Sequence, residues 1–200
     1  MRKPTRKLER DSEHRYTCNG KVVPGTTEVI SDCKLSYFSM VQAERLEFAR
    51  LRGLYVHATL EFEDQGDLLE DTLSDTLKPY LTAWRRFKKE AKFAPDKNGI
   101  ELMGYSTTYG FAGQCDRIGK IRGKPAIIDI KPANYQRWWE VQLTAYAMIF
   151  FPGKIPYLLD VSLHPDGTYR VWQADVKRFV DNRDVFLAAL KIWQYKRKGK

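Results

Sequence analysis

Several features are scarce in this 200-residue chain, and each scarcity excludes a class of protein. The three cysteines, Cys18, Cys33 and Cys115, match no zinc-ligand spacing and are too few to bind an iron–sulfur cluster through four thiolates. Such a sparse, odd set favours a reducing compartment. No apolar run approaches the roughly 20 residues that span a bilayer. The basic N-terminus lacks the apolar segment of a secretory signal.

Acidic residues are outnumbered, because 25 Asp and Glu stand against 34 Lys and Arg, which leaves a formal charge of +9. A surplus of this sign favours a polyanionic partner, either nucleic acid or an anionic membrane surface. The hydrophobic share of 43% and the charged share of 30% are ordinary for a globular protein. The length fits one domain, so we expect a single domain over residues 1–200 with flexible tails at 1–15 and 196–200.

Hydrophobic periodicity predicts both helices and strands. Helical spacing predicts helices over 39–63, 76–93, 135–151 and 175–195. Apolar and β-branched runs predict strands over 100–105, 110–118 and 126–130, and then a hairpin of 157–163 with 169–174. We expect residues 21–30 to be extended around a Pro-Gly turn, 95–99 to form a turn, and the acidic stretch 61–75 to be a solvated helix end and loop. This order predicts an α/β protein with a mixed β-sheet flanked by helices.

The residues that point to chemistry are Asp116, Asp129 and Lys131, on two neighbouring predicted strands. Alternation along a strand places Asp129 and Lys131 on the same sheet face. Two carboxylates a few ångströms apart repel unless a cation lies between them, and hard oxygen ligands select Mg²⁺ or Mn²⁺. A lysine beside such an ion can position water and stabilise charge on a phosphate. An Asp-x-Lys pair is usually a surface ion pair, but Asp129 follows an apolar run, where a solvated pair is not expected.

Four segments together resemble a known family. They are Ala49–His57 on a predicted helix, Gly113-Gln-Cys-Asp116-Arg-Ile-Gly119, Ile128-Asp129-Ile-Lys131, and Gln142-Leu-Thr-Ala-Tyr146. In this order and spacing they resemble the PD-(D/E)xK phosphodiesterase superfamily, in its RecB-like and Cas4-like branch, which includes small phage exonucleases and the mitochondrial genome maintenance exonuclease. The segment Val23–Ile30 resembles one found near the start of phage members. The resemblance covers about residues 22–163.

The resemblance implies a restriction-endonuclease-like fold and a metal-dependent DNA exonuclease that leaves 5′-phosphate ends. It implies Asp116, Asp129 and Lys131 as catalytic residues, and His57, Asp116, Asp129 and the Ile130 carbonyl as ligands of Mg²⁺ or Mn²⁺. It implies no iron–sulfur cluster, because the cysteines that hold one in some members are absent. Pro132 stands where Thr or Ser is common, which affects only a local substrate contact. We expect a cytoplasmic location in a bacterial or phage-infected cell; a mitochondrial location is less favoured.

Other residues are candidates for support or for DNA binding, each with a structural alternative. Supporting candidates are Glu101, as an extra metal or water ligand, and Gln142 with Tyr146, one helical turn apart. Candidates for DNA binding are Tyr135, Arg137, Trp138, Trp139, Arg85 and Arg86. The structural alternatives are that at least one tryptophan belongs to the core and that the arginines form a solvated helix face.

Two other functions stay open at this point. One is a structure-specific or sequence-specific endonuclease that uses the same site. The other is a non-catalytic DNA-binding or recombination protein that keeps a nuclease fold, although the complete set of Asp116, Asp129 and Lys131 argues against it. The expected partner is DNA, single-stranded or with a free end, and a recombination or single-strand-binding protein fits the same role in DNA recombination or repair.

Overall fold

A five-stranded mixed sheet organises the chain in this computed structural model, which describes residues 7–36, 43–131 and 135–198. Its strands, in spatial order, are β4 (Phe93–Ser106), β5 (Phe111–Ile121), β6 (Lys124–Lys131), β7 (Tyr157–Leu163) and β8 (Tyr169–Gln173). Neighbouring strands are antiparallel except β6 and β7, which run parallel. The predicted mixed sheet flanked by helices is therefore confirmed, as are the predicted hairpins at Arg122-Gly123 and at 164–167.

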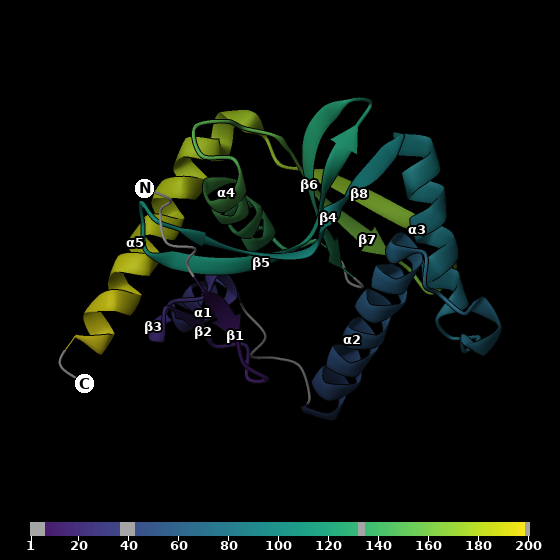
Figure 1. Ribbon diagram of the computed structural model, residues 1–200, viewed down its shortest axis with the longest axis horizontal. Helices are drawn as coiled ribbons and strands as arrows, with labels where there is room; N and C mark the ends of the chain where they lie inside the picture. The colour runs from purple at the N-terminus through teal and green to yellow at the C-terminus, as the bar shows by residue number, and fades with distance from the viewer. Residues whose placement is uncertain (1–6, 37–42, 132–134, 199–200) are drawn as a thin grey trace.

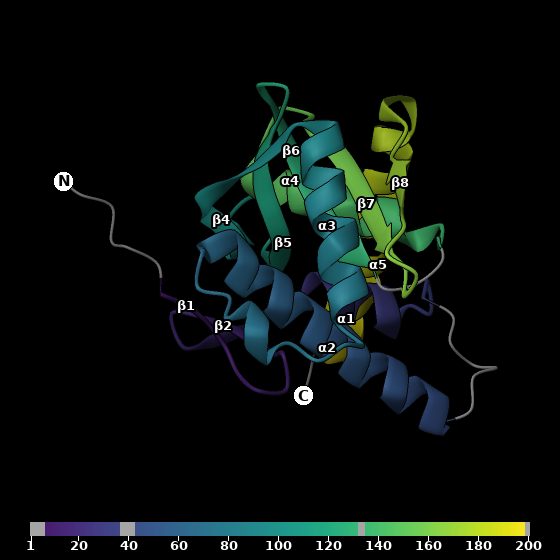
Figure 2. The same cartoon turned by 90° about the vertical axis from the view of Figure 1, so that its right-hand side faces the viewer.

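Helices cover both faces of this sheet (Figures 1 and 2). One face carries α4 (Trp138–Phe150), backed by α5 (Phe179–Arg197); the other carries α2 (Ala43–Gln65) and α3 (Lys78–Ala91). Alternation along β6 divides its side chains between the two faces. Ile127 packs with Leu143 on the α4 side, whereas Ile128 and Ile130 join the core beneath α2 and α3. Because α4 connects β6 to β7, it supplies the crossover that a parallel pair requires.

A small antiparallel sheet precedes the main one and ends in a short helix (Figure 1). Its elements are β1 (Leu8–Arg10), β2 (Tyr16–Cys18), β3 (Lys21–Val23) and α1 (Thr26–Asp32). The expectation of a flexible tail over 1–15 is thus wrong for residues 8–15, and residues 1–6 lie outside the described part. An extended 21–30 is wrong for its second half, which is helical. Buried Tyr16 packs with Ala112 of β5, and the Ala112 amide donates to the Pro24 carbonyl at 2.8 Å, so this sheet is attached to the main one.

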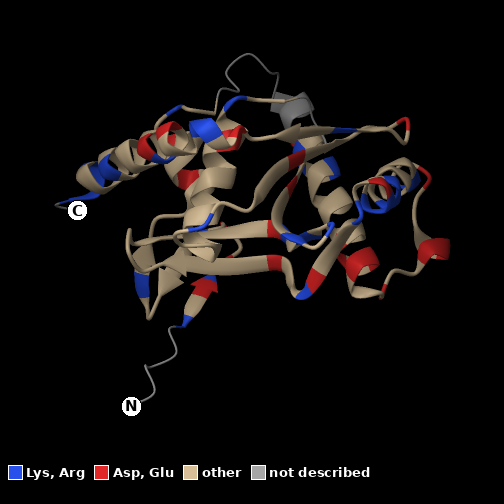
Figure 3. Ribbon diagram, turned by 90° about the horizontal axis from the view of Figure 1, so that it is seen from above, with Lys and Arg blue, Asp and Glu red and all other residues tan. Residues whose placement is uncertain are grey.

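Three further boundaries differ from expectation. The predicted turn at 95–99 lies inside β4 as a bulge, because the register shifts between Pro95 and Ile100. The α3 helix stops at Ala91, since Lys92 adopts a left-handed conformation, and β4 begins at once. Within the acidic stretch, α2 continues to Gln65 and a 3-10 turn, η1 (Glu70–Thr72), follows. At the C-terminus α5 remains helical to Arg197, and its last turn is basic (Figure 3). Residues 37–42 and 199–200 lie outside the described part of the chain.

Two glycines of β5 allow close approach of neighbouring segments. A Cβ atom at Gly113 would lie 2.6 Å from the Thr26 hydroxyl oxygen of α1. A Cβ atom at Gly119 would overlap the Ala94 carbonyl oxygen of β4. Glycine is therefore required by packing at both positions. Among the helices that the structure describes, none has both the length and the apolar character needed to cross a bilayer.

Candidate metal and catalytic site

The candidate site begins with three side chains from three elements. Glu101 of β4 and Asp116 of β5 lie opposite one another, between the Ile100–Arg117 and Leu102–Cys115 pairs of the ladder. His57 reaches them from α2: its Nδ1 lies 3.6 Å from Asp116 Oδ1 and 3.9 Å from Glu101 Oε1. One donor atom of each residue lies within 4.8 Å of the others. Two carboxylates and an imidazole at this separation fit one Mg²⁺ or Mn²⁺ ion.

Asp129 adds a third carboxylate from the next strand. The antiparallel β5–β6 ladder pairs Arg117 with Ile128, so Asp116, which precedes Arg117, lies next to Asp129, which follows Ile128. Asp129 is almost fully buried, and the Ile130 amide donates a 2.6 Å hydrogen bond to Asp116 Oδ2. The structure thus links Ile130 to Asp116 through its amide, and the role of its carbonyl as a ligand stays a prediction. Figure 3 shows acidic segments of neighbouring strands gathered near the centre of the molecule.

The excess of carboxylates perturbs the titration of the whole cluster. Burial lowers the pKa of His57, but the charges of Asp116 and Glu101 outweigh it and raise that pKa to about 9. Burial raises the pKa of Asp116, reinforced by Asp129 and Glu101 and partly offset by His57. The cluster therefore holds a proton on His57 when no other cation is present. A divalent cation would take the place of that proton, since metal ligands must be deprotonated.

Lys131 is held in one position by several partners. Its Nζ forms an ion pair with Asp129 and donates a 2.9 Å hydrogen bond to Gln142 Oε1 of α4. The Gln142 side-chain amide in turn donates to the Tyr146 hydroxyl at 2.9 Å and to the Thr27 hydroxyl at 3.3 Å. Burial lowers the pKa of Lys131, but the charges of Asp129, Asp160 and Asp116 raise it by more. The structure thus places Gln142 and Tyr146 where the sequence predicted support for the site.

Sequence reasoning missed Asp160, which lies beside Asp129 on the parallel strand β7. Its side chain is 1% exposed, and neither carboxylate oxygen has a hydrogen-bond partner among the described residues. A buried polar group without a partner is rare and costly. A signal was available, because Leu158-Leu159-Asp160-Val161 repeats the pattern of Ile127-Ile128-Asp129-Ile130, with an acid inside an apolar strand.

We expect Asp160→Asn to stabilise the protein at neutral and alkaline pH. Burial and the charge of Asp129 raise the pKa of Asp160 well above its ordinary value, and Lys131 only partly offsets them. Because its pKa is raised in the folded state, the Asp160 carboxyl destabilises the fold least below its unfolded pKa of about 3.9. Folding stability then falls as the pH rises from that value toward the folded pKa. The amide cannot ionise and avoids this loss. A gain of about 1 kcal/mol would raise Tm by about 2–4 °C.

Thermal unfolding of wild type and Asp160→Asn from about pH 4 to about pH 8, with Asp67→Asn as an exposed control, measures this difference. The two curves are expected to meet at the acidic end and to separate as the pH rises. A variant that is less stable than wild type at the alkaline end would show that the Asp160 charge is stabilising.

A second buried network was also missed. Arg117 is fully buried; its Nε lies 2.7 Å from Asp64 Oδ2 of α2, and its Nη1 lies 2.9 Å from Glu101 Oε1. Asp64 also accepts hydrogen bonds from Lys88 Nζ at 2.6 Å and from the Trp84 indole at 3.1 Å. Glu101 has a left-handed φ of +47°, which costs a non-glycine residue roughly 1–2 kcal/mol. Arg117 therefore fixes a strained residue of the candidate metal site.

The predicted DNA-stacking aromatics are engaged within the protein. Trp139 is 2% exposed, so its prediction as a stacking surface is wrong and the alternative, a core tryptophan, is confirmed. Trp138 is partly buried, and Lys131 Nζ lies 5.4 Å and 5.5 Å from the ring centroids of Trp138 and Trp139. Tyr135 packs on Trp172 of β8 at 4.8 Å between ring centroids. Arg137 is exposed, so it alone among these four is fully open to a ligand.

The predicted DNA-binding arginines of α3 are ion-paired. Arg85 binds Glu63 and Glu70, each at 2.8 Å, and Arg86 binds Glu90 at 2.7 Å. These partners neutralise much of the charge that phosphates would require. The alternative, a solvated helix face, describes both residues better.

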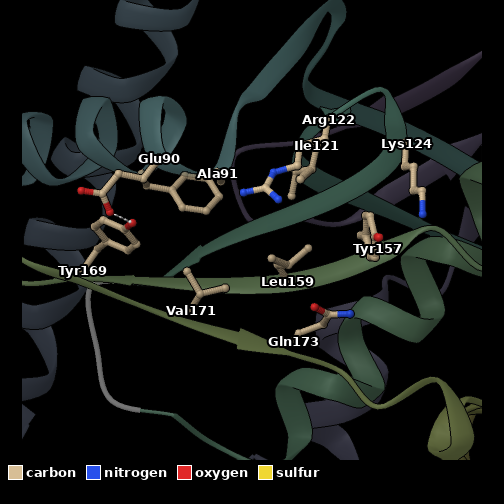
Figure 4. A pocket seen from close by; sticks show the side chains of 11 residues that line it. Glu90, Ala91, Ile121, Arg122, Lys124, Tyr157, Leu159, Tyr169, Val171 and Gln173 are labelled. Atoms are coloured by element: carbon tan, nitrogen blue, oxygen red, sulfur yellow. Dashed lines mark hydrogen bonds between the residues drawn. The ribbon is translucent and has the colours of Figure 1, made fainter.

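Two cavities differ in their relation to this cluster. One, of about 580 Å³, is lined by Glu101, Gln114 and Asp116 together with residues of β1, β2 and α1. The other, of about 540 Å³, lies between the end of α3 and strands β7 and β8 and contains none of the candidate catalytic residues (Figure 4). Its rim includes Glu90, whose carboxylate accepts a hydrogen bond from Tyr169. Of these two cavities, the first is therefore the one that borders the candidate ligands Glu101 and Asp116.

Comparison with known proteins adds no assignment to this geometry. A search of protein-family models gives no match to the chain, and a search of the curated proteins gives no relative.

Proposed function

We propose that this protein is a metal-dependent deoxyribonuclease with a PD-(D/E)xK site, acting as an exonuclease. One observation carries the proposal: the donors of His57, Glu101 and Asp116 lie together beside the buried Asp129–Lys131 ion pair. A cluster of cation ligands next to a fixed ammonium group suits the cleavage of a phosphodiester, whose negative charge increases in the transition state.

Each residue has a role that follows from its position. His57, Glu101 and Asp116, with Asp129 next to them, would hold Mg²⁺ or Mn²⁺, and the ion would supply Lewis-acid stabilisation of the phosphate. Lys131 remains an ammonium at neutral pH because its pKa is raised, so it donates hydrogen bonds and does not accept the proton of the attacking water. Gln142 and Tyr146 keep Lys131 Nζ directed at the site. Lys131 thereby stabilises charge on a non-bridging phosphate oxygen.

The proposed activity also suggests a substrate and a biological role. The substrate would be DNA, single-stranded or with a free end, and the products would carry 5′-phosphates. Such an activity serves DNA recombination, repair or processing in a bacterial or phage-infected cell, next to recombination or single-strand-binding proteins.

A cleavage assay tests this function. End-labelled single-stranded and double-stranded DNA would be incubated with Mg²⁺, Mn²⁺ or EDTA, using wild type, Asp116→Asn, and Asp71→Asn as the exposed control. We expect metal-dependent laddering from one end, retained in the control and lowered at least about 100-fold in Asp116→Asn. Cleavage of a circular single strand would identify an endonuclease instead. DNA left intact by wild type with both metals contradicts the proposed function.

A further inference from the structure

The cavity beside the candidate metal ligands has a second wall that faces them. Its lining includes Glu101, Gln114 and Asp116 of the main sheet and, from the end of β1 and the turn to β2, Arg10, Glu13, His14 and Arg15. At about 580 Å³ it has the size of a small-molecule ligand site. Any group that enters this space to reach Asp116 therefore meets the cationic side chains of the β1–β2 turn.

The turn itself is a fixed structure. The Asp11 carboxylate accepts hydrogen bonds from the backbone amides of Glu13 and Arg15, each at 2.9 Å, and His14 occupies the left-handed conformation with φ +60°. On the strand side, Tyr16 is buried against Ala112 of β5. The side chains of the turn are thus held at a set position relative to the sheet, as a binding wall requires.

The charges of this wall are not equally available. Arg15 is bound to Asp11 at 2.8 Å and to Glu13 at 3.1 Å, and Glu28 accepts from the Trp193 indole at 2.9 Å. Arg10 has no carboxylate partner among the described residues, and its charge lowers the pKa of Tyr16, which burial raises. Arg10 is also exposed. Its side chain hydrogen-bonds Tyr16 and no carboxylate among the described residues, so among the cations of this wall it is the one whose charge is not neutralised.

The α2 helix, which carries His57 of the metal cluster, also comes near the β1–β2 turn. Burial lowers the pKa of His14, the charges of Arg10 and Arg50 lower it further, and Asp11 partly offsets them, so Arg50 of α2 lies near the turn. His57 of the metal cluster follows Arg50 by seven residues on α2, on the same helix face. The metal cluster and the β1–β2 turn therefore both lie near the same face of α2.

We propose that the β1–β2 turn binds a phosphate group of the nucleic acid next to the one that is cleaved, with Arg10 as its principal ligand. This rests on the proposed function, which places the cleaved phosphate at His57, Glu101 and Asp116. Carboxylates alone would repel the substrate, and the arginine opposite them supplies attraction for the flanking phosphate. Arg10 is a binding residue here and takes no part in bond cleavage.

Binding measurements without turnover test the wall separately from cleavage. Fluorescence anisotropy of a labelled single-stranded oligonucleotide, in EDTA and from about 50 to about 300 mM NaCl, would compare wild type with Arg10→Gln and Arg10→Lys. Arg85→Gln is the matched control, because Arg85 is also a surface arginine but is paired with Glu63 and Glu70. Oligonucleotides with and without a terminal phosphate distinguish a terminal from a backbone phosphate. The KM for cleavage in Mn²⁺ is measured in parallel.

We expect Arg10→Gln to weaken binding about 3- to 10-fold and to reduce the salt slope by about 1, with a higher KM and an unchanged kcat. Arg10→Lys restores most of the affinity, and the control matches wild type. An Arg10→Gln variant that binds within about twofold of wild type with the same salt slope overturns the proposal, as does a wild type that binds no DNA at about 50 mM NaCl.

If wild type binds DNA through Arg10 but cleaves none, the proposed nuclease function fails and the binding wall stands. If wild type cleaves and Arg10→Gln changes neither slope nor KM, the wall fails and the nuclease stands.

Discussion

Replacing Lys131 by glutamine is expected to lower DNA cleavage by about 100- to 1000-fold while metal binding is retained. The variant loses the ammonium that would face the phosphate in the proposed function, but it keeps the donors of His57, Glu101 and Asp116. Calorimetric titration with Mn²⁺ should therefore give an affinity close to that of wild type. Single-turnover cleavage of the end-labelled substrate then reports the lost stabilisation of the transition state alone.

Lys88→Gln is the matched control for this experiment. Lys88 is as buried as Lys131, pairs with Asp64 at 2.6 Å and lies 5.9 Å from the Trp84 ring centroid, but it belongs to α3 and lies outside the candidate site. Both variants leave an aspartate short of a partner, so both should lose stability, and only Lys131→Gln should lose cleavage. Equal cleavage losses in the two variants would mean that Lys131 acts only through the stability of the fold.

Arg117→Leu is expected to destabilise the protein by about 3–5 kcal/mol, the usual cost of removing one partner of a buried ion pair. The guanidinium is fully buried between Asp64 and Glu101, and without it Asp64 keeps, among the described residues, Lys88 and Trp84 as partners. For a chain of this length the loss corresponds to a fall in Tm of about 6–20 °C. Denaturant and thermal unfolding measure it, and no nuclease activity is needed.

A double variant separates lost charge pairing from lost packing. Adding Asp64→Leu to Arg117→Leu removes the carboxylate that has lost its fully buried cationic partner, and we expect it to recover part of the stability, although Lys88 then loses its closest carboxylate partner. Arg85→Leu is the control, because Arg85 is 42% exposed and its ion pairs should contribute less than about 1 kcal/mol each. A loss for Arg117→Leu that is no larger than that of the control would contradict a structural role for the network.

Some of the fold and site could be predicted because the deciding signals are local. The run Ile127-Ile128-Asp129 encloses an acid in a buried strand, and Arg122-Gly123 supplies the positive φ angles of a tight hairpin turn. These two features bring β5 and β6 together and place Asp116 next to Asp129. The position of Gln142 under Lys131 follows in turn from a helix that must return to form a parallel strand.

Other parts depend on contacts between distant segments. Arg117 and Asp64 are 53 residues apart, and no spacing rule relates them. His57 was indicated only by resemblance, since a single histidine on a helix has no local signature of metal binding. The small N-terminal sheet was missed for another reason: its strands have three residues each, too few for a periodic pattern. Its turn at Asn19-Gly20 is nevertheless a strong hairpin signal that could have been used.

Gly113 and Gly119 of β5 have a consequence for the interpretation of mutational data. Neither residue has an atom that could take part in the reaction, but each lies three residues from Asp116 and fills a position where a side chain would displace α1 or β4. In a saturation screen scored by the proposed cleavage, both positions would tolerate no substitution and would rank with Asp116, the proposed metal ligand. Scored by folding yield instead, they would separate from it, because Asp116→Asn keeps the packing that the glycines allow. Intolerance of substitution along this strand thus combines two constraints, and only a paired readout assigns each position to its cause.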